Sequence, residues 1–316
     1  MKEAKEFLDM IKEASYIAVV AHKDPDADSL GSASAIYSFC LQLHKKVSFV
    51  CVSEIQRHFF ILPWVDRIKH SFGSEDLLIV CDAASWERVG LDKRGKVINI
   101  DHHITNKHYG DLNIIKDDAI ATTEVVYDLF RELDVKINEK MATALYAGVV
   151  DDSDSFSSSK TDSATFALAK ELIELGAKHK DVVKYLQKYS TLSHLRLLGA
   201  MLLDMRLLKD ATIALFEVEY VKFKRYGADY EDAKEALERA LELPTVKTSI
   251  LILEKEDGSI KISLRSCEVD CASVAIRFGG GGHSERAGCE FGHDVSIQEA
   301  REKILEEVKR VEKKKR

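Results

Sequence analysis

Four short acidic segments of this sequence could hold metal ions. The first, HKDPDADSLGS at residues 22–32, places three aspartates within five residues. Carboxylates this close repel one another unless water or cations surround them. The other three segments are Asp82, the triplet DHH at 101–103 and the run DDSD at 151–154. Imidazoles accompany the carboxylates at His22 and in the triplet.

Carboxylates mixed with imidazoles, without thiolates, favour harder divalent ions such as Mn²⁺ or Mg²⁺. So many ligands suit two ions about 3.5–4 Å apart, which stabilise the attacking and leaving oxygens of a displaced phosphoryl group and lower the pKa of a bridging water. The acidic segments therefore predict two-metal hydrolysis of phosphoesters. The six cysteines show no zinc-type spacing and are expected to be small buried hydrophobes.

The elements that must position these residues follow from the apolar pattern. Short β-branched runs predict strands at 16–22, 47–52, 77–83 and 96–103, and apolar spacing predicts helices at 29–43, 121–133 and 141–153. This alternation indicates a mostly parallel α/β sheet. Ligands bind outside the carboxyl ends of such strands, where the acids stand, so we expect the acids to meet. The last of these helices is expected to end in an acidic loop.

The two histidines of the triplet are adjacent in sequence. If the strand continues through them, their side chains point to opposite faces of the sheet. One could then bind a metal while the other faces a different neighbour, and spacing alone does not say which.

The second half of the chain predicts another domain. Residues 161–208 have a helical pattern with no clear strand, and strands are expected at 211–219, 248–258 and 259–266, with a hairpin turn at Glu256-Asp257-Gly258. Helices are expected at 271–278 and at the C-terminus. The predicted fold is α/β with a larger parallel-sheet domain (1–190), a helical linker (191–209) and a smaller α/β domain (210–316).

Four consecutive glycines at 279–282 precede His283 and Arg286, and Arg265 lies nearby in the sequence. Glycine backbone can approach a ligand closely, and its N–H groups can form an anion-binding nest. Arginine suits phosphate because its guanidinium donates two parallel hydrogen bonds. This segment predicts an anion site.

The net charge of −7 argues against binding of long nucleic acid by general electrostatics. Small nucleotides or short fragments are the expected partners, not long duplexes. No apolar run approaches the roughly 18–20 residues that span a bilayer. A cytoplasmic location is expected, and a homodimer is compatible with the sequence.

The segments HKDPDADSLGS, VCDAAS (80–85), DHH (101–103) and VVDDSDSF (149–156) resemble, in order, the four motifs of the DHH phosphoesterase family. The resemblance runs through most of residues 1–190. It implies one metal held by His22, Asp26 and Asp82, and a second held by Asp28, Asp82, His102 and the fourth-motif acid. His103 would face the substrate phosphate, and Asp101 joins it as an expected catalytic residue.

Alignment from Gly148 assigns the fourth-motif ligand to Asp152. The family often has glycine two residues after this acid, where this chain has Asp154. Asp151 and Asp154 therefore remain alternatives to Asp152. The expected cofactors are two divalent ions, with Mn²⁺ preferred over Mg²⁺ or Co²⁺.

The glycine segment resembles the GGGH motif of the DHHA1 domain, which accompanies nucleotide-cleaving members of the family. This resemblance covers roughly 210–316 and is specific around 262–288. It implies hydrolysis of short oligoribonucleotides or 3′-phosphoadenosine-5′-phosphate in a cleft between the domains. Alternatives are a cyclic-di-AMP or pApA phosphodiesterase, a single-strand exonuclease, for which the chain lacks room, and a catalytically silent nucleotide sensor. The residues implied to bind substrate are Arg265, Ser266, Gly281, Gly282, His283 and Arg286.

Overall fold

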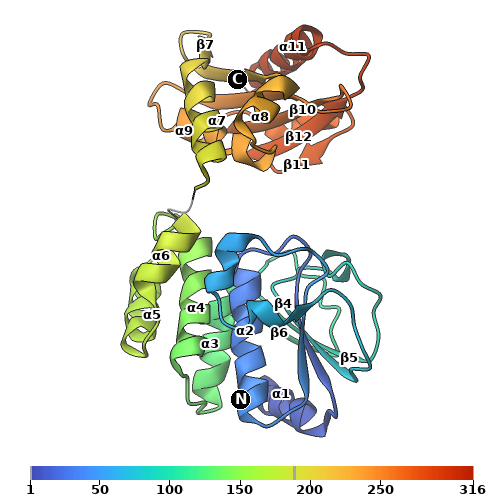
Figure 1. The fold of residues 1–316 in the computed structure, drawn as a ribbon, viewed down its shortest axis with the longest axis vertical. Helices are drawn as coiled ribbons and strands as arrows, with labels where there is room; N and C mark the ends of the chain where they lie inside the picture. The colour runs from blue at the N-terminus through green and yellow to red at the C-terminus, as the bar shows by residue number, and fades with distance from the viewer. Residues whose placement is uncertain (1, 188–189, 316) are drawn as a thin grey trace. The chain divides into compact units, whose positions relative to one another are not determined.

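The computed structural model describes residues 2–187 and 190–315. The chain forms two compact units, Met1–Tyr189 and Ser190–Arg316 (Figure 1). Each unit contains its own sheet, and the predicted α/β class is confirmed. Among the described residues, no helix is both long and apolar enough to cross a membrane.

The first unit is built on a six-stranded parallel sheet in the order β3-β2-β1-β4-β5-β6. The central strands are continuous apolar runs, as expected of strands buried on both faces. Strand alternation divides β1 between two clusters: Val19 packs on one face and Val20 on the other. The strands are β1 (Ile17–Ala21), β2 (Val47–Val50), β3 (Ile68–Lys69), β4 (Leu77–Cys81), β5 (Lys96–Asp101) and β6 (Leu112–Ile115).

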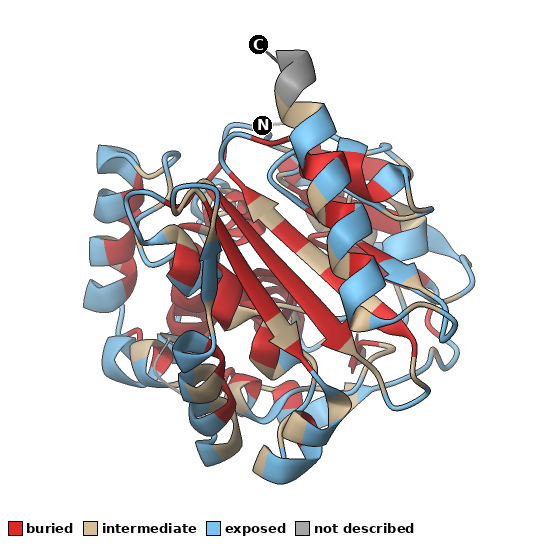
Figure 2. Ribbon diagram, turned by 90° about the horizontal axis from the view of Figure 1, so that it is seen from above, coloured by how far each residue is buried: buried red, intermediate tan, exposed pale blue. Residues whose placement is uncertain are grey.

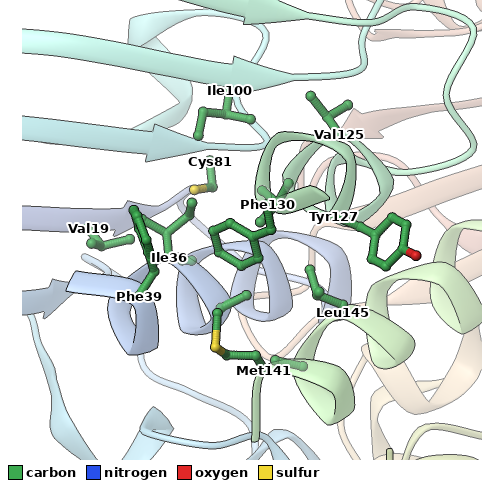
Figure 3. Packing of buried hydrophobic residues seen from close by; sticks show 14 of the residues in the cluster. Val19, Ile36, Phe39, Cys81, Ile100, Val125, Tyr127, Phe130, Met141 and Leu145 are labelled. Carbon is green, nitrogen blue, oxygen red and sulfur yellow. The ribbon is translucent and has the colours of Figure 1, made fainter. Parts of the chain in front are cut away.

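Helices α2 and α3 pack on one face of this sheet, and α4 packs against both of them, so that the three helices enclose the main core. Figure 3 shows Phe130 of α3 and Met141 and Leu145 of α4 packed toward Ile36 of α2 and Cys81 of β4. Burial of such side chains stabilises the unit by roughly 1.5–3 kcal/mol each. The helices are α1 (Lys2–Glu13), α2 (Ala27–Gln42), α3 (Thr122–Glu132), α4 (Glu139–Asp152), α5 (Ser163–Glu174) and α6 (His179–Gln187), with 3-10 turns η1 (Arg57–Ile61), η2 (Val65–Arg67) and η3 (Trp86–Arg88).

The second unit contains a mixed sheet in the order β11-β12-β10-β9-β8-β7. The predicted hairpin is confirmed: β9 and β10 pair antiparallel around Gly258, whose φ is 78°. Strands β8 and β9 pair in parallel. The strands are β7 (Arg206–Leu208), β8 (Ile213–Val218), β9 (Thr248–Glu254), β10 (Ile260–Ser266), β11 (Gly281–Gly282) and β12 (Arg286–Phe291).

Helices pack on both faces of the second sheet. Ile304 of α11 belongs to the cluster on one face, and Leu197 of α7 belongs to the cluster on the other. Figure 2 shows the buried residues concentrated along the strands and on the inner sides of the helices. The helices are α7 (Leu192–Leu203), α8 (Tyr220–Tyr226), α9 (Glu235–Leu241), α10 (Cys271–Ile276) and α11 (Ile297–Lys315), with the 3-10 turn η4 (Glu231–Ala233).

The segment predicted as a helical linker contains α7, which packs within the second unit. The helical pattern predicted for 161–208 was wrong at its end, where Arg206–Leu208 forms strand β7; its residues 188 and 189 lie outside the described residues. Strands β6 and β12 were not predicted. Asn113 interrupts β6, and β12 contains Gly288 and no β-branched residue, so neither has the apolar β-branched run that predicts a strand. Five of the six cysteines are buried, and Cys267 is exposed.

Candidate functional site

The predicted acids and histidines of the first unit lie together at the carboxyl edge of the parallel sheet. His22 follows β1, and Asp82 follows β4 with a left-handed φ of 60°, a conformation rare outside glycine. The Nε2 atom of His22 lies 3.4 Å from Oδ2 of Asp82 and 3.4 Å from Oδ2 of Asp26. These three side chains form a group that could hold a metal ion.

A second such group consists of Asp28, His102 and Asp152. Asp28 is completely buried, and Nε2 of His102 lies 3.0 Å from Oδ2 of Asp152. The same His102 atom is 3.8 Å from Oδ1 of Asp82, so Asp82 stands between the two groups. All six predicted metal ligands therefore lie together in one cluster of side chains, called here the acidic pocket.

The three candidate fourth-motif acids have different surroundings. Asp151 and Asp152 occupy the last turn of α4, within the helix predicted at 141–153, and Asp154 lies in the turn that follows. Asp151 accepts a hydrogen bond from the backbone of Ala27, 2.9 Å away. Asp154 accepts a bond from the hydroxyl of Ser157. Of the three, Asp152 is the one in a ligand group.

The two triplet histidines do not point to opposite faces. Strand β5 ends at Asp101, so the alternation of a strand no longer applies to them. Their ring centroids are 4.7 Å apart, and Nδ1 of His103 lies 3.6 Å from Oδ1 of Asp82. Both imidazoles border the acidic pocket, and they differ in exposure: 10% for the His102 side chain and 44% for that of His103.

Asp101 is buried below His103 and orients it. Its Oδ1 accepts hydrogen bonds from Nδ1 of His103 at 2.7 Å and from the backbone N–H of His102 at 2.9 Å. Its Oδ2 accepts from the amide of Asn106 at 2.5 Å. The hydrogen bond to Asp101 raises the pKa of His103 above its usual value.

The carboxylates of the pocket are held by Thr122, which the sequence analysis did not single out. Its hydroxyl donates to Oδ1 of Asp82 at 2.8 Å, and its backbone N–H donates to Oδ2 of Asp28 at 2.7 Å. The N–H of Thr123 donates to the other Asp28 oxygen at 2.9 Å. These N–H groups begin α3, where the helix dipole favours negative charge. Two threonines at the start of a predicted helix were the sequence feature that could have indicated this support of the carboxylates.

Close packing behind the pocket requires Gly148 of α4. A Cβ atom at this position would lie 2.4 Å from Oδ1 of Asp28 and 2.5 Å from Cγ2 of Thr123. Any larger residue would therefore displace Asp28 or the start of α3.

The histidines of the two ligand groups are oriented as metal ligands usually are. Nδ1 of His22 lies 2.8 Å from the carbonyl of Lys23, and Nδ1 of His102 lies 3.3 Å from that of Ala119. A ring N–H given to a carbonyl fixes the tautomer and leaves Nε2 free to bind a metal.

The electrostatics of the pocket also fit divalent ions. Burial raises the pKa of Asp28 well above its usual value, and the charges of Asp82 and Asp152 raise it further. Burial alone would lower the pKa of His22, yet hydrogen bonds to Asp26 and Asp82 raise it to about 10. The carboxylates thus hold protons on the imidazole, and divalent ions would supply the same positive charge while releasing them. The residues present therefore fit a metal in each group.

The second unit carries a groove of about 580 Å³ beside the glycine run, called here the basic groove. Arg265 and Arg286 stand directly opposite each other on β10 and β12. Like charges at opposed strand positions are destabilising, so this pair favours an anion between them. Arg265 also donates to Glu238 at 2.8 Å, whereas Arg286 forms no ion pair among the described residues. The groove is lined by Lys234, Lys261, Ile262, Ser263, Arg265, Gly279, Gly280, Gly281, His283, Arg286, Ala287, Gly288, Cys289 and Glu290.

The glycines of the run have different roles. A Cβ atom on Gly280 would lie 2.2 Å from the carbonyl oxygen of Gly288, and one on Gly282 would lie 2.5 Å from that of Arg286. Both glycines are required by the packing of β11 against β12. A Cβ atom on Gly281 would meet no atom within 4 Å, so this backbone is open to a ligand.

Ser266 is placed differently from the other predicted substrate-binding residues. It is 4% exposed, and its hydroxyl lies 2.9 Å from the carbonyl of Lys247 and 2.9 Å from the hydroxyl of Thr248. It also accepts a bond from the N–H of Val269 at 2.8 Å. Ser266 therefore holds the turn after β10 and presents no free hydroxyl. His283 is exposed, and its N–H donates to the carbonyl of Arg286.

The parallel sheet with its acidic pocket defines an α/β protein able to hold divalent ions. The DHH family, N-terminal domain, matches residues 16–149, and the DHHA1 domain matches residues 214–314. The chain belongs to the DHH family and carries a DHHA1 domain, as the sequence motifs predicted.

Relatives align along nearly the whole chain. The bifunctional oligoribonuclease and PAP phosphatase NrnA of Thermus thermophilus is 30% identical over 98% of this chain and 93% of its own. The protein of the same name from Bacillus subtilis is 25% identical over 87% and 90% of the two chains. An exopolyphosphatase-related protein from Bacteroides fragilis superposes with a TM-score of 0.89 at 23% identity, over 98% and 96% of the chains, and shares the fold.

Proposed function

We propose that this protein is a metal-dependent phosphoesterase that hydrolyses short oligoribonucleotides and 3′-phosphoadenosine-5′-phosphate. The observation that carries this proposal is the gathering of six ligand side chains from distant segments into the acidic pocket. The full-length similarity to NrnA of Thermus thermophilus supports the choice of substrates.

In this proposal His22, Asp26 and Asp82 hold one divalent ion, and Asp28, His102 and Asp152 hold the other, with Asp82 shared. The short distances from His22 and His102 to Asp82 support a shared ligand. Two bound ions would lower the pKa of a water and neutralise charge on the phosphoryl group. Mn²⁺ is the proposed ion, because imidazole and carboxylate ligands together suit it.

His103 and Asp101 have a separate role in the proposal. Because Nδ1 of His103 is bonded to Asp101, its Nε2 is the atom available to the substrate. The raised pKa of His103 favours the protonated ring, which donates a hydrogen bond to a phosphoryl oxygen. Asp101 holds the ring in place and stabilises its positive charge.

In the second unit, we propose that the basic groove binds a substrate phosphate. Arg265 and Arg286 supply charged donors, and His283 supplies a further ring nitrogen. Gly281 and Gly282 contribute backbone, with the open space at Gly281 available to the anion. Ser266 supports this site by holding the turn after Arg265.

The decisive experiment compares four substrates side by side: a short RNA, 3′-phosphoadenosine-5′-phosphate, linear pApA and cyclic di-AMP. Each is assayed with Mn²⁺, Mg²⁺ or Co²⁺ after removal of bound metal by a chelator. We expect turnover of the first two substrates, greatest with Mn²⁺ and absent without added metal. Turnover of cyclic di-AMP alone would overturn the substrate assignment. Nucleotide binding without turnover of any substrate would identify a sensor.

A further inference from the structure

Arg88 lies beside the acidic pocket and has no part in the assignments above. It ends the 3-10 turn η3, which follows β4 and Asp82. Its carbonyl accepts a hydrogen bond from the backbone N–H of Lys23 at 2.7 Å, which ties this turn to the loop after β1. The two loops that carry His22 and Asp82 are therefore fixed to each other next to the Arg88 side chain.

One end of the Arg88 guanidinium, its Nη2 atom, lies over the ring of His22. This atom lies 3.3 Å from Nδ1 and 3.5 Å from Nε2 of that ring. An atom in the ring plane at nearly equal distances from both nitrogens would collide with the C–H group between them, so Nη2 lies over the face. Both ring nitrogens also have nearer or equal partners, Lys23 on one side and Asp26 and Asp82 on the other. Arginine commonly packs against the faces of aromatic rings.

Among the described residues Arg88 has no carboxylate partner, although it stands next to the acidic pocket. Within residues 2–187, Arg67, Arg94 and Arg131 each form an ion pair, and Arg88 forms none. Its side chain is exposed. Contact with the ring through Nη2 leaves the Nε and Nη1 donors of the guanidinium available for an anion.

We propose that Arg88 binds a non-bridging oxygen of the phosphoryl group that occupies the acidic pocket. The inference rests on the proposed function and adds to it a substrate contact from the first unit. The contact with His22 places the cation at the border of the ligand groups, where it would neutralise charge that the phosphoryl group brings. A planar, forked donor at this place selects a tetrahedral oxyanion over a neutral ligand.

The test begins with binding of inorganic phosphate to the Mn²⁺-loaded protein, measured by calorimetry. We expect Arg88→Gln to weaken phosphate binding about 10- to 100-fold, the usual effect of losing a hydrogen bond to a charged group. Arg88→Lys keeps the charge but lacks the forked guanidinium, and its phosphate affinity should lie between those of Arg88→Gln and the wild type. Arg67→Gln removes the same charge from a surface pair and is the matched control, with phosphate affinity unchanged.

Two further measurements separate substrate contact from support of His22. Mn²⁺ affinity should be the same in Arg88→Gln and the wild type. On a substrate that the wild type cleaves, kcat/KM of Arg88→Ala should fall about 100-fold and recover partly with added guanidinium. Wild-type phosphate affinity in Arg88→Gln, or a defect that excess Mn²⁺ removes, would overturn the inference. A wild type that binds phosphate through Arg88 yet cleaves none of the four substrates would instead refute the proposed function.

Discussion

The acidic pocket and the basic groove carry charges of opposite sign and hold them in different ways. The pocket gathers buried carboxylates whose oxygens are held by hydrogen bonds, as Asp28 is by Thr122 and Thr123. The groove presents the cations of Arg265, which is partly exposed, and Arg286, which is exposed, on opposed strands beside open glycine backbone. Buried charge has to be compensated by fixed partners, whereas exposed charge is screened by water.

The difference indicates where precision is needed. A metal site requires ligand atoms fixed within tenths of an ångström, and the pocket achieves this with paired acceptors and donors. A phosphate site tolerates more movement, because a guanidinium can bind an oxyanion in several arrangements. Substitutions in the pocket should therefore act through metal binding and catalysis, and those in the groove through substrate binding.

The largest effect is expected from Asp82→Asn. This change removes the carboxylate that stands between the two ligand groups, and several kcal/mol of transition-state stabilisation should be lost, on the order of 10³-fold or more in kcat/KM. The stability of the metal-free fold should change little, because the substitution removes both repulsion from Asp28 and attraction to the protonated ring of His22. Steady-state kinetics and thermal melts test both parts. Retention of wild-type activity would contradict the metal mechanism.

Thr122→Val tests the support of the pocket with little change in shape. The substitution removes the hydroxyl that donates to Asp82 and keeps the backbone N–H that donates to Asp28. Loss of such a support usually costs about 10- to 100-fold in metal affinity. Titration with Mn²⁺ measures the affinity, and activity should return at high metal. Thr122→Ser, which keeps the hydroxyl, is the control and should behave as the wild type.

Arg286→Gln tests the groove. We expect KM to rise about 10-fold, since one charge-assisted hydrogen bond to the substrate is lost, with a smaller effect on kcat and none on Mn²⁺ affinity. Arg277→Gln changes an exposed arginine of the same unit outside the groove lining and should leave KM unchanged. A drop in metal affinity for Arg286→Gln would contradict the division of roles between the two regions.

The smallest effects are expected from alanine substitutions at two neighbouring glycines, Gly280 and Gly281, which should differ from each other. Gly280→Ala should lower stability by about 1–3 kcal/mol, because its new methyl group would overlap the carbonyl oxygen of Gly288. Gly281→Ala should change stability by less than about 0.5 kcal/mol, since its methyl group meets no protein atom. It should nevertheless raise KM by occupying space open to the substrate. Denaturant melts and kinetics on both variants measure these outcomes, and equal melts for the two would contradict the packing argument.

Much of the fold could be predicted because it is encoded locally. Apolar runs such as 77–83 and amphipathic stretches such as 121–133 carry the periodicity of strand and helix in adjacent residues. The order of strands and helices then places Asp82 and the triplet at one edge of a parallel sheet. Strand β6 lacks this signal because Asn113 interrupts its apolar run.

What the sequence determined by itself was the set of chemical groups, the α/β framework and the family. The tertiary structure decided how those groups are used. Both triplet imidazoles turn toward Asp82 because β5 ends before them. The hydroxyl of Ser266 is hydrogen-bonded within the turn after β10. It also brought in Thr122 and Arg88, which no motif marked. Side-chain direction and hydrogen-bond partners depend on how loops that are distant in the sequence pack together, and local sequence patterns do not encode that packing.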